Sequence, residues 1–415
     1  MGPHAGQGHR SRFPLRCRRC GSPLWDLPAS LFSHFDQTAA WQAVASNGGS
    51  AEHVGWGGAV ADLTEGMGTN TNSMFTCIST AGIALFLSGQ TSFQLNVTSA
   101  GPIPISELAE PPFGIPSSAN PLLSILTAEE SNLFAKEYGV VVNRSTAAQA
   151  QLAGAMLPAG AGGIANPPQY LDPMTNKLTD NPLATSLQTV ARVISGSSGL
   201  GVTRQIFYLQ LGSFDTHNNQ AIQHAQLLTQ LGQALEYFDG LMVASGLGNQ
   251  VTIFTASDFG RTLTCNTDGT DHGWGSHHFV VGGAVQGQNM YGVSPIVGVN
   301  QSNDVGAGRL IPTTSVDQYA GPLARWPAGS ASPTARFAKS SPTSPTSLTL
   351  ALIPTWISSA SWFPTKGDEF YRQHGPPTCG FGARRCRAPA PEHGARLRRI
   401  HLELIKNSRP EASSL

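Results

Sequence analysis

Gln205-Ile-Phe-Tyr-Leu-Gln-Leu211 is the stretch that decides the fold, because it is an almost continuous apolar run of strand length, as in a strand buried on both faces. Asn218–Ala244 follows as a predicted long helix, since apolar residues recur along it every three or four positions. Val251–Thr255 (VTIFT) and His278–Gly283 (HFVVGG) are two further predicted strands. A strand, a long helix and a strand at this spacing predict an α/β fold with a mostly parallel sheet and helices on both faces.

Capping residues mark the helices that flank this unit. Asn181-Pro182 predicts a helix start with proline at the first helical position. Thr127–Glu130 and Ser315–Gln318 have the capping-box pattern, and each predicts the start of another helix. We therefore expect one domain over residues 33–326.

The two ends of the chain differ in composition from this domain. Residues 1–32 form a predicted irregular basic tail, and residues 327–415 a Ser/Pro/Arg-rich, largely irregular one. Out-of-frame translation at both ends is one hypothesis for this bias. The tails also contain four cysteines, Cys17, Cys20, Cys379 and Cys386, and a second hypothesis is that these cysteines bind zinc.

The charge distribution limits the classes of partner. The 415 residues contain 25 Lys+Arg and 25 Asp+Glu, so the formal net charge is zero. Residues 1–20 and 366–415 carry 15 basic and 5 acidic side chains, which leaves 10 basic and 20 acidic ones for residues 21–365. An acidic body argues against a nucleic-acid-binding domain and leaves only the basic tails as candidates for such binding. No apolar stretch approaches about 18 residues, so no transmembrane helix is predicted, and no export signal is visible.

Polar residues with metal-binding chemistry follow the predicted strands. Asp215 and His217 come after the first strand, and Asp258 and Arg261 come after the second. Asp271, His272 and His277 precede the third strand. Because ligands of parallel sheets bind beyond the carboxyl ends of the strands, these residues predict a site for zinc, manganese, iron or calcium, with an anion-binding arginine.

Each of these residues also has a structural interpretation. Asp215 and His217 could cap the following helix, Asp258 could anchor a turn, and His277 could be a hydrogen-bonded core residue. Ser33 precedes a predicted helix through Trp41, where it is either an N-cap or a nucleophile placed where backbone N–H groups favour an anion.

Six motifs in order resemble an uncharacterised bacterial family catalogued as domain of unknown function 1501. They are Ser33–Gln37 with Trp41, Gly55–Gly58, Ser213–Asn218, Phe254–Thr262, Gly269–His278 and Gly308–Ser315. That family resembles the alkaline-phosphatase-like superfamily, which includes sulfatases, and its members usually begin with an export signal. The resemblance implies an alkaline-phosphatase-like domain, a periplasmic or secreted location for the family, and hydrolysis of phosphate or sulfate esters.

In that superfamily, one metal binds an Asp and a His after one strand and a later His, which match Asp215, His217 and His272 or His277. A second metal binds positions that match Asp258 and Ser33. The resemblance therefore implies one or two divalent ions, with Ser33 as nucleophile and Arg261 holding an ester oxygen. The substrate would be a small-molecule or saccharide ester, and the sequence leaves the oligomeric state open.

Two departures from the superfamily pattern concern the second metal. Asp258 is followed by Phe259 instead of His, and no Gly-Gly-x-Asp-Gly loop of an opening strand precedes Ser33. A missing first strand would leave a gap in the sheet and puts the activity of this truncated form in question. The alternative is a non-catalytic, export-associated binding or structural protein with the same fold.

Overall fold

The structure is a computed structural model that describes residues 32–43, 54–116, 120–129, 131–324 and 347–354. Its central sheet has six strands in the order β2-β1-β5-β10-β6-β9. Their bounds are β1 Cys77–Ser79, β2 Gln94–Asn96, β5 Arg204–Leu211, β6 Val251–Thr255, β9 Val280–Val281 and β10 Ser347–Pro354. Five of these strands are parallel, and β9 pairs with β6 in the antiparallel direction.

The three central strands end at one edge of the sheet. Leu211 of β5 pairs with Pro354 of β10, and Thr255 of β6 pairs with Leu352. The loops that leave β5 and β6 therefore start on the same side of the molecule.

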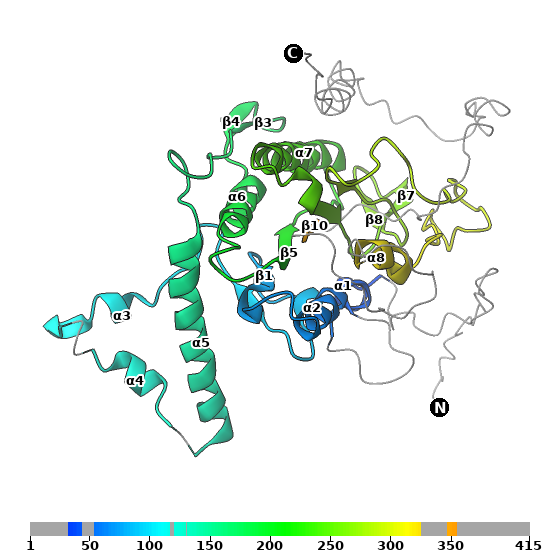
Figure 1. Cartoon of the computed structure of the whole chain (residues 1–415). Helices are drawn as coiled ribbons and strands as arrows, with labels where there is room; N and C mark the ends of the chain where they lie inside the picture. The colour runs from blue at the N-terminus through cyan, green and yellow to red at the C-terminus, as the bar shows by residue number, and fades with distance from the viewer. Residues whose placement is uncertain (1–31, 44–53, 117–119, 130, 325–346, 355–415) are drawn as a thin grey trace, which may run out of the picture.

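Helices cover both faces of the sheet (Figure 1). On one face lie α6 (Pro182–Ser195) and α7 (Gln220–Ala244), and on the other lie α1 (His34–Gln42), α2 (Trp56–Gly66) and α8 (Val316–Ala324). The long helix α5 (Leu133–Ala155) runs beside α6, and the short helices α3 (Ser106–Ala109) and α4 (Leu122–Leu126) lie farther from the sheet. Two hairpins complete the fold, β3 (Tyr170–Asp172) with β4 (Lys177–Thr179) and β7 (Arg261–Cys265) with β8 (Thr270–His272).

The apolar run of β5 is explained by burial on both faces. Phe207 and Leu209 belong to the core beneath α6 and α7, whereas Ile206 and Tyr208 belong to the core beneath α2 and α8. Neighbouring side chains of a strand point to opposite faces, so a strand between two helical layers needs apolar residues at every position. The predicted α/β class with parallel strands and helices is confirmed.

Most predicted elements occur within a few residues of their expected bounds. Asn181 caps α6, accepting hydrogen bonds from Leu183 and Ala184, and Gln318 donates its backbone N–H to the hydroxyl of Ser315 at the start of α8. The prediction that Thr127 opens a helix was wrong. Thr127 ends α4, and the side chain of Asn132 caps α5 instead.

Two other segments differ from the expected pattern. The predicted strand over 278–283 is reduced to the two residues of β9. Residues 347–354, which the composition placed in the C-terminal tail, form β10 between β5 and β6. The zinc hypothesis for the four tail cysteines falls on residues outside those that the structure describes. In the described part of the chain, no helix combines the length and apolar character needed to cross a membrane.

Candidate metal centre

The candidate site lies in the loops that leave β5 and β6. After β5, buried and exposed residues alternate along the chain. Phe214 and Thr216 are only 1% and 2% exposed, whereas Asp215 and His217, which follow them in turn, are exposed. A left-handed backbone at Ser213, with φ of 72°, turns the chain out of the strand. Burial of the alternate residues thus holds the carboxylate and the imidazole on the outer side of the loop.

The hairpin β7–β8 brings Arg261 and His272 into the same place, because the two residues are directly paired across it. Arg261 donates to both the hydroxyl and the backbone carbonyl of Thr270 and contacts Asp215 through its guanidinium. Gly269 lies so close to the backbone of His217 that a Cβ atom there would clash with the His217 carbonyl group. The hairpin therefore packs tightly on the loop that carries Asp215 and His217.

Three potential metal-ligand atoms converge between these loops. Oδ1 of Asp215 lies 2.9 Å from Nε2 of His217 and 3.2 Å from Nε2 of His272, and the two Nε2 atoms are 3.0 Å apart. The far nitrogens of both rings face acceptors: Nδ1 of His272 lies 2.9 Å from the carbonyl oxygen of Phe32, and Nδ1 of His217 lies 3.4 Å from Oδ1 of Asp271. Because Nδ1 of each ring has an acceptor of its own, each ring is held with its Nε2 turned toward Oδ1 of Asp215.

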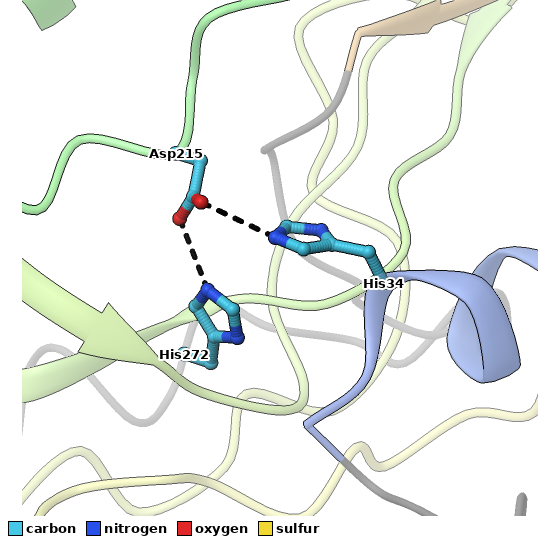
Figure 2. A group of neighbouring side chains, drawn as sticks. All are labelled: His34, Asp215 and His272. Carbon is cyan, nitrogen blue, oxygen red and sulfur yellow. Dashed lines mark hydrogen bonds and ion pairs between the residues drawn. The ribbon is translucent and has the colours of Figure 1, made fainter.

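His34, at the start of α1, joins this triangle to the loop after β6. Its Nε2 lies 3.2 Å from Oδ2 of Asp215, and its Nδ1 contacts Oδ2 of Asp258. Figure 2 shows His34 and His272 on two sides of the Asp215 carboxylate, and one ligand atom from each of the three residues lies within 4.8 Å of the others. The side chain of Asp258 is 1% exposed, and its other oxygen accepts hydrogen bonds from the backbone of Phe259 and the hydroxyl of Ser257.

The charges of the site shift the pKa values of its titrating groups. Burial alone would raise the pKa of Asp215, but Arg261, His272 and His217 outweigh it and hold the pKa below its usual value. Burial alone would lower the pKa of His34, but Asp258 and Asp215 outweigh that effect and raise it. A hydrogen bond from Asn266 lowers the pKa of Asp271. Asp215 is thus held as an anion and His34 favours the cationic form, as expected for an imidazole between two carboxylates.

The other predicted residues lie around this cluster in different ways. The hydroxyl of Ser33 accepts a hydrogen bond from the backbone N–H of Asp36 at 3.3 Å, so the N-cap interpretation is confirmed. Asp271 contacts Nδ1 of His217 and not the Nε2 atom that faces Asp215. His277 is exposed, and in the described part of the chain no hydrogen bond or ion pair joins it to the cluster. Of the two candidates for the later histidine ligand, His272 is the one that lies at the site.

Several contributors were not recognised in the sequence. His34 was overlooked beside Ser33, although an imidazole at a helix start next to a candidate nucleophile is a usable signal. Phe259 packs against the rings of His34 and His272, with centroids 4.7 and 4.5 Å away. Arg309 donates to the backbone carbonyl of His272 at 2.8 Å and lies over the ring of Phe32. Such backbone and ring contacts depend on tertiary structure and leave no motif.

A small recess adjoins the buried carboxylate of Asp258. It has a volume of about 50 Å³, and its walls include Trp41, Trp56, Phe86 and Tyr208. A space of this size admits water molecules or a small chemical group. The cluster is therefore bordered on one side by a narrow, aromatic recess.

Comparison with known proteins places the chain in a family. No curated protein and no solved structure matches it. The profile of one protein family, described as "Protein of unknown function (DUF1501)", matches residues 14–320, beginning inside the predicted N-terminal tail and covering all of the residues in the cluster. The chain therefore belongs to the DUF1501 family.

Proposed function

We propose that this chain is a metal-dependent hydrolase of phosphate or sulfate esters, with Asp215, His217 and His272 holding a divalent cation. One observation carries the proposal: a carboxylate oxygen and the Nε2 atoms of two imidazoles lie 2.9 to 3.2 Å from one another. Such atoms repel one another at this distance unless positive charge lies among them. The guanidinium of Arg261, which contacts Oδ1 of Asp215, supplies part of that charge, and the proposed cation would supply the rest.

The donor set fits a transition-metal ion. Around one zinc ion with bonds of about 2.0 to 2.1 Å, tetrahedral ligand atoms lie about 3.3 Å apart, which is close to the three separations observed here. Two imidazoles and one carboxylate favour zinc or manganese over calcium, which prefers oxygen ligands. The contact from Asp271 to His217 is of the kind that orients a metal-binding histidine.

His34 and Asp258 lie beside this triangle, and Ser33, which precedes His34 at the start of α1, completes the second half of the proposed site. Ser33 is the proposed nucleophile, because its hydroxyl lies at the N-terminus of α1, where the helix dipole favours an anion. Its Oγ would bond to phosphorus or sulfur as the alcohol oxygen leaves with a proton, and water would then release phosphate or sulfate and restore the hydroxyl. Arg261 orients Asp215 through their ion pair. A bound cation would polarise the ester and lower the pKa of the attacking group.

The proposed relation to the alkaline-phosphatase-like superfamily is supported by the arrangement of the carboxylates. Asp215 and Asp258 follow two parallel strands at one edge of the sheet, and His34 links them. The strand between β5 and β6 comes from residues 347–354, outside the family match of 14–320. This supports the proposal that the described residues lack the family's own opening strand.

The test uses the full chain, stripped of metal and then loaded with zinc or manganese. We expect turnover of p-nitrophenyl phosphate or sulfate only after loading, and we expect Ser33→Ala to bind metal normally and to lose turnover. Because a lost N-cap costs about 1 kcal/mol, thermal unfolding of this variant serves as the control for folding. Turnover by the stripped protein would reject a metal-dependent mechanism.

A second candidate function is non-catalytic metal binding in an export-associated protein. It is favoured by the hydrogen bond that the backbone N–H of Asp36 donates to the hydroxyl of Ser33, because this bond gives the proposed nucleophile a structural role. Stoichiometric zinc without turnover of either ester would favour this candidate over the hydrolase.

A further inference from the structure

The long helix α5 extends beyond the body of the protein. Figure 1 shows its C-terminal half beside α6 and its N-terminal half reaching away from the sheet, with α4 as a neighbour. Only Gly139, Ala148 and Leu152 are buried along its 23 residues. The N-terminal half is therefore a projecting arm.

One face of α5 carries an apolar stripe that is interrupted by Ser145, and only part of this stripe is covered. Ala148 and Leu152 are fully buried where the helix meets the body. Phe134, Tyr138 and Val141 continue the same face at helical spacing, yet they are 86%, 60% and 37% exposed. The same stripe is thus buried where the body supports it and bare along the arm.

The opposite face of the arm is already occupied. Gly139 lies about 140° around the helix from Phe134, and its closest approach is to Leu126 and Thr127 at the end of α4. The bare face is widened by Leu133 and Val140, which are 77% and 50% exposed. Glu137 and Arg144 lie between these two residues and the stripe, so the exposed apolar face contains one acidic and one basic side chain. An exposed face of this kind is typical of a protein–protein contact.

The charges within this face are self-complementary. Glu137 and Arg144 lie seven residues apart on one side of the stripe, with their midpoint between Val140 and Val141. The exposed part of α5, residues 133–147, is centred on Val140, which almost coincides with the midpoint between Glu137 and Arg144. If a second α5 packs antiparallel about a two-fold axis at that midpoint, Glu137 of each copy meets Arg144 of the other.

We propose that the bare face of α5 is a homodimer interface, in which two copies of the chain pack their α5 helices antiparallel. The interface covers Phe134, Tyr138 and Val141 and forms the Glu137–Arg144 pair twice. Within one chain Arg144 lies over the ring of Phe93, with its guanidinium carbon 4.2 Å from the centroid, and in the dimer it would also meet Glu137 of the second copy. This proposal is independent of the chemistry at the metal centre.

The test is the mass of the full chain in solution, measured by light scattering and sedimentation from about 1 to 200 µM, the range that suits a small interface. We expect the mass to rise from 43.6 kDa toward twice that value. Phe134→Glu should weaken the dimer at least about 100-fold, whereas the control Met290→Glu, at an 83% exposed position elsewhere, should leave it unchanged. Far-UV circular dichroism confirms that each variant folds.

Charge reversal tests the antiparallel register. Glu137→Arg or Arg144→Glu alone places like charges together twice and should weaken the dimer about tenfold, while the double variant should restore it. A chain that stays monomeric at every concentration would overturn the proposal, and so would a dimer that Phe134→Glu does not weaken. A double variant whose dimer is no tighter than that of either single variant would overturn the antiparallel register. Binding of a monomeric chain to lipid vesicles through the arm would assign the face to a membrane instead.

Discussion

Replacing His272 with alanine removes one of the three convergent ligand atoms. The other nitrogen of this ring lies 2.9 Å from the carbonyl oxygen of Phe32, which orients the ring toward Asp215. Loss of an orienting partner around a metal typically costs 10- to 100-fold in affinity, and a ligand contributes more than such a partner. We therefore expect His272→Ala to weaken zinc binding at least about 100-fold, or about 2.7 kcal/mol.

His277→Ala is the matched control, since it removes an imidazole five residues away that lies outside the cluster. Its zinc affinity should stay within about twofold of the parent. The assay is competition with a chromogenic chelator, using metal-stripped full chain, and thermal unfolding of the stripped variants checks that both are folded. Equal loss of affinity in the two variants, or an unchanged affinity in His272→Ala, would refute the assignment of the ligands.

Three further changes test other parts of the account. Asp271→Asn should weaken zinc binding about tenfold with little loss of stability, because Asp271 orients His217 from an exposed position; a chelator titration measures this, and a loss as large as that of His272→Ala would make Asp271 a ligand. Gly269→Ala should weaken zinc binding by at least about tenfold, since its Cβ would displace the backbone of His217, and unchanged affinity would contradict the tight packing of the hairpin. Burial lowers the pKa of His278 to about 3, below its value in the unfolded chain, so its contribution to stability is complete above about pH 6.5 and decreases as the pH falls toward 3. At pH 5 this loss reaches about 2 kcal/mol, and in urea unfolding at pH 5 and 7.5 the variant His278→Phe should lose less stability than the parent; equal losses would refute the burial of a neutral imidazole.

The sequence was sufficient to predict the central part of the fold. The continuous apolar run of β5 and the three- and four-residue periodicity of α7 identify a parallel sheet between helical layers, since few other arrangements bury both patterns. The prediction failed where local signals competed. Thr127 has the right spacing for a capping box, but α5, the helix that packs on α6, starts at Leu133. The side chain of Asn132 therefore caps it.

The candidate site was only partly predictable for a related reason. The sequence could predict that Asp215 and Asp258 lie near each other, because the carboxyl ends of parallel strands share one edge of the sheet. His272 and His277 could not be separated by sequence, since the choice depends on the pairing of Arg261 with His272 across a hairpin. The contact of His34 with both carboxylates joins residues 181 and 224 positions apart, and no local pattern reports it.

The most direct test of the metal centre is anomalous diffraction from crystals of the full chain soaked in zinc. The account predicts one strong peak bounded by Oδ1 of Asp215, Nε2 of His217 and Nε2 of His272, at about 2.0 to 2.2 Å from each atom. Zinc found only at other residues, such as His277 or Cys265, with these three side chains unliganded, would contradict it.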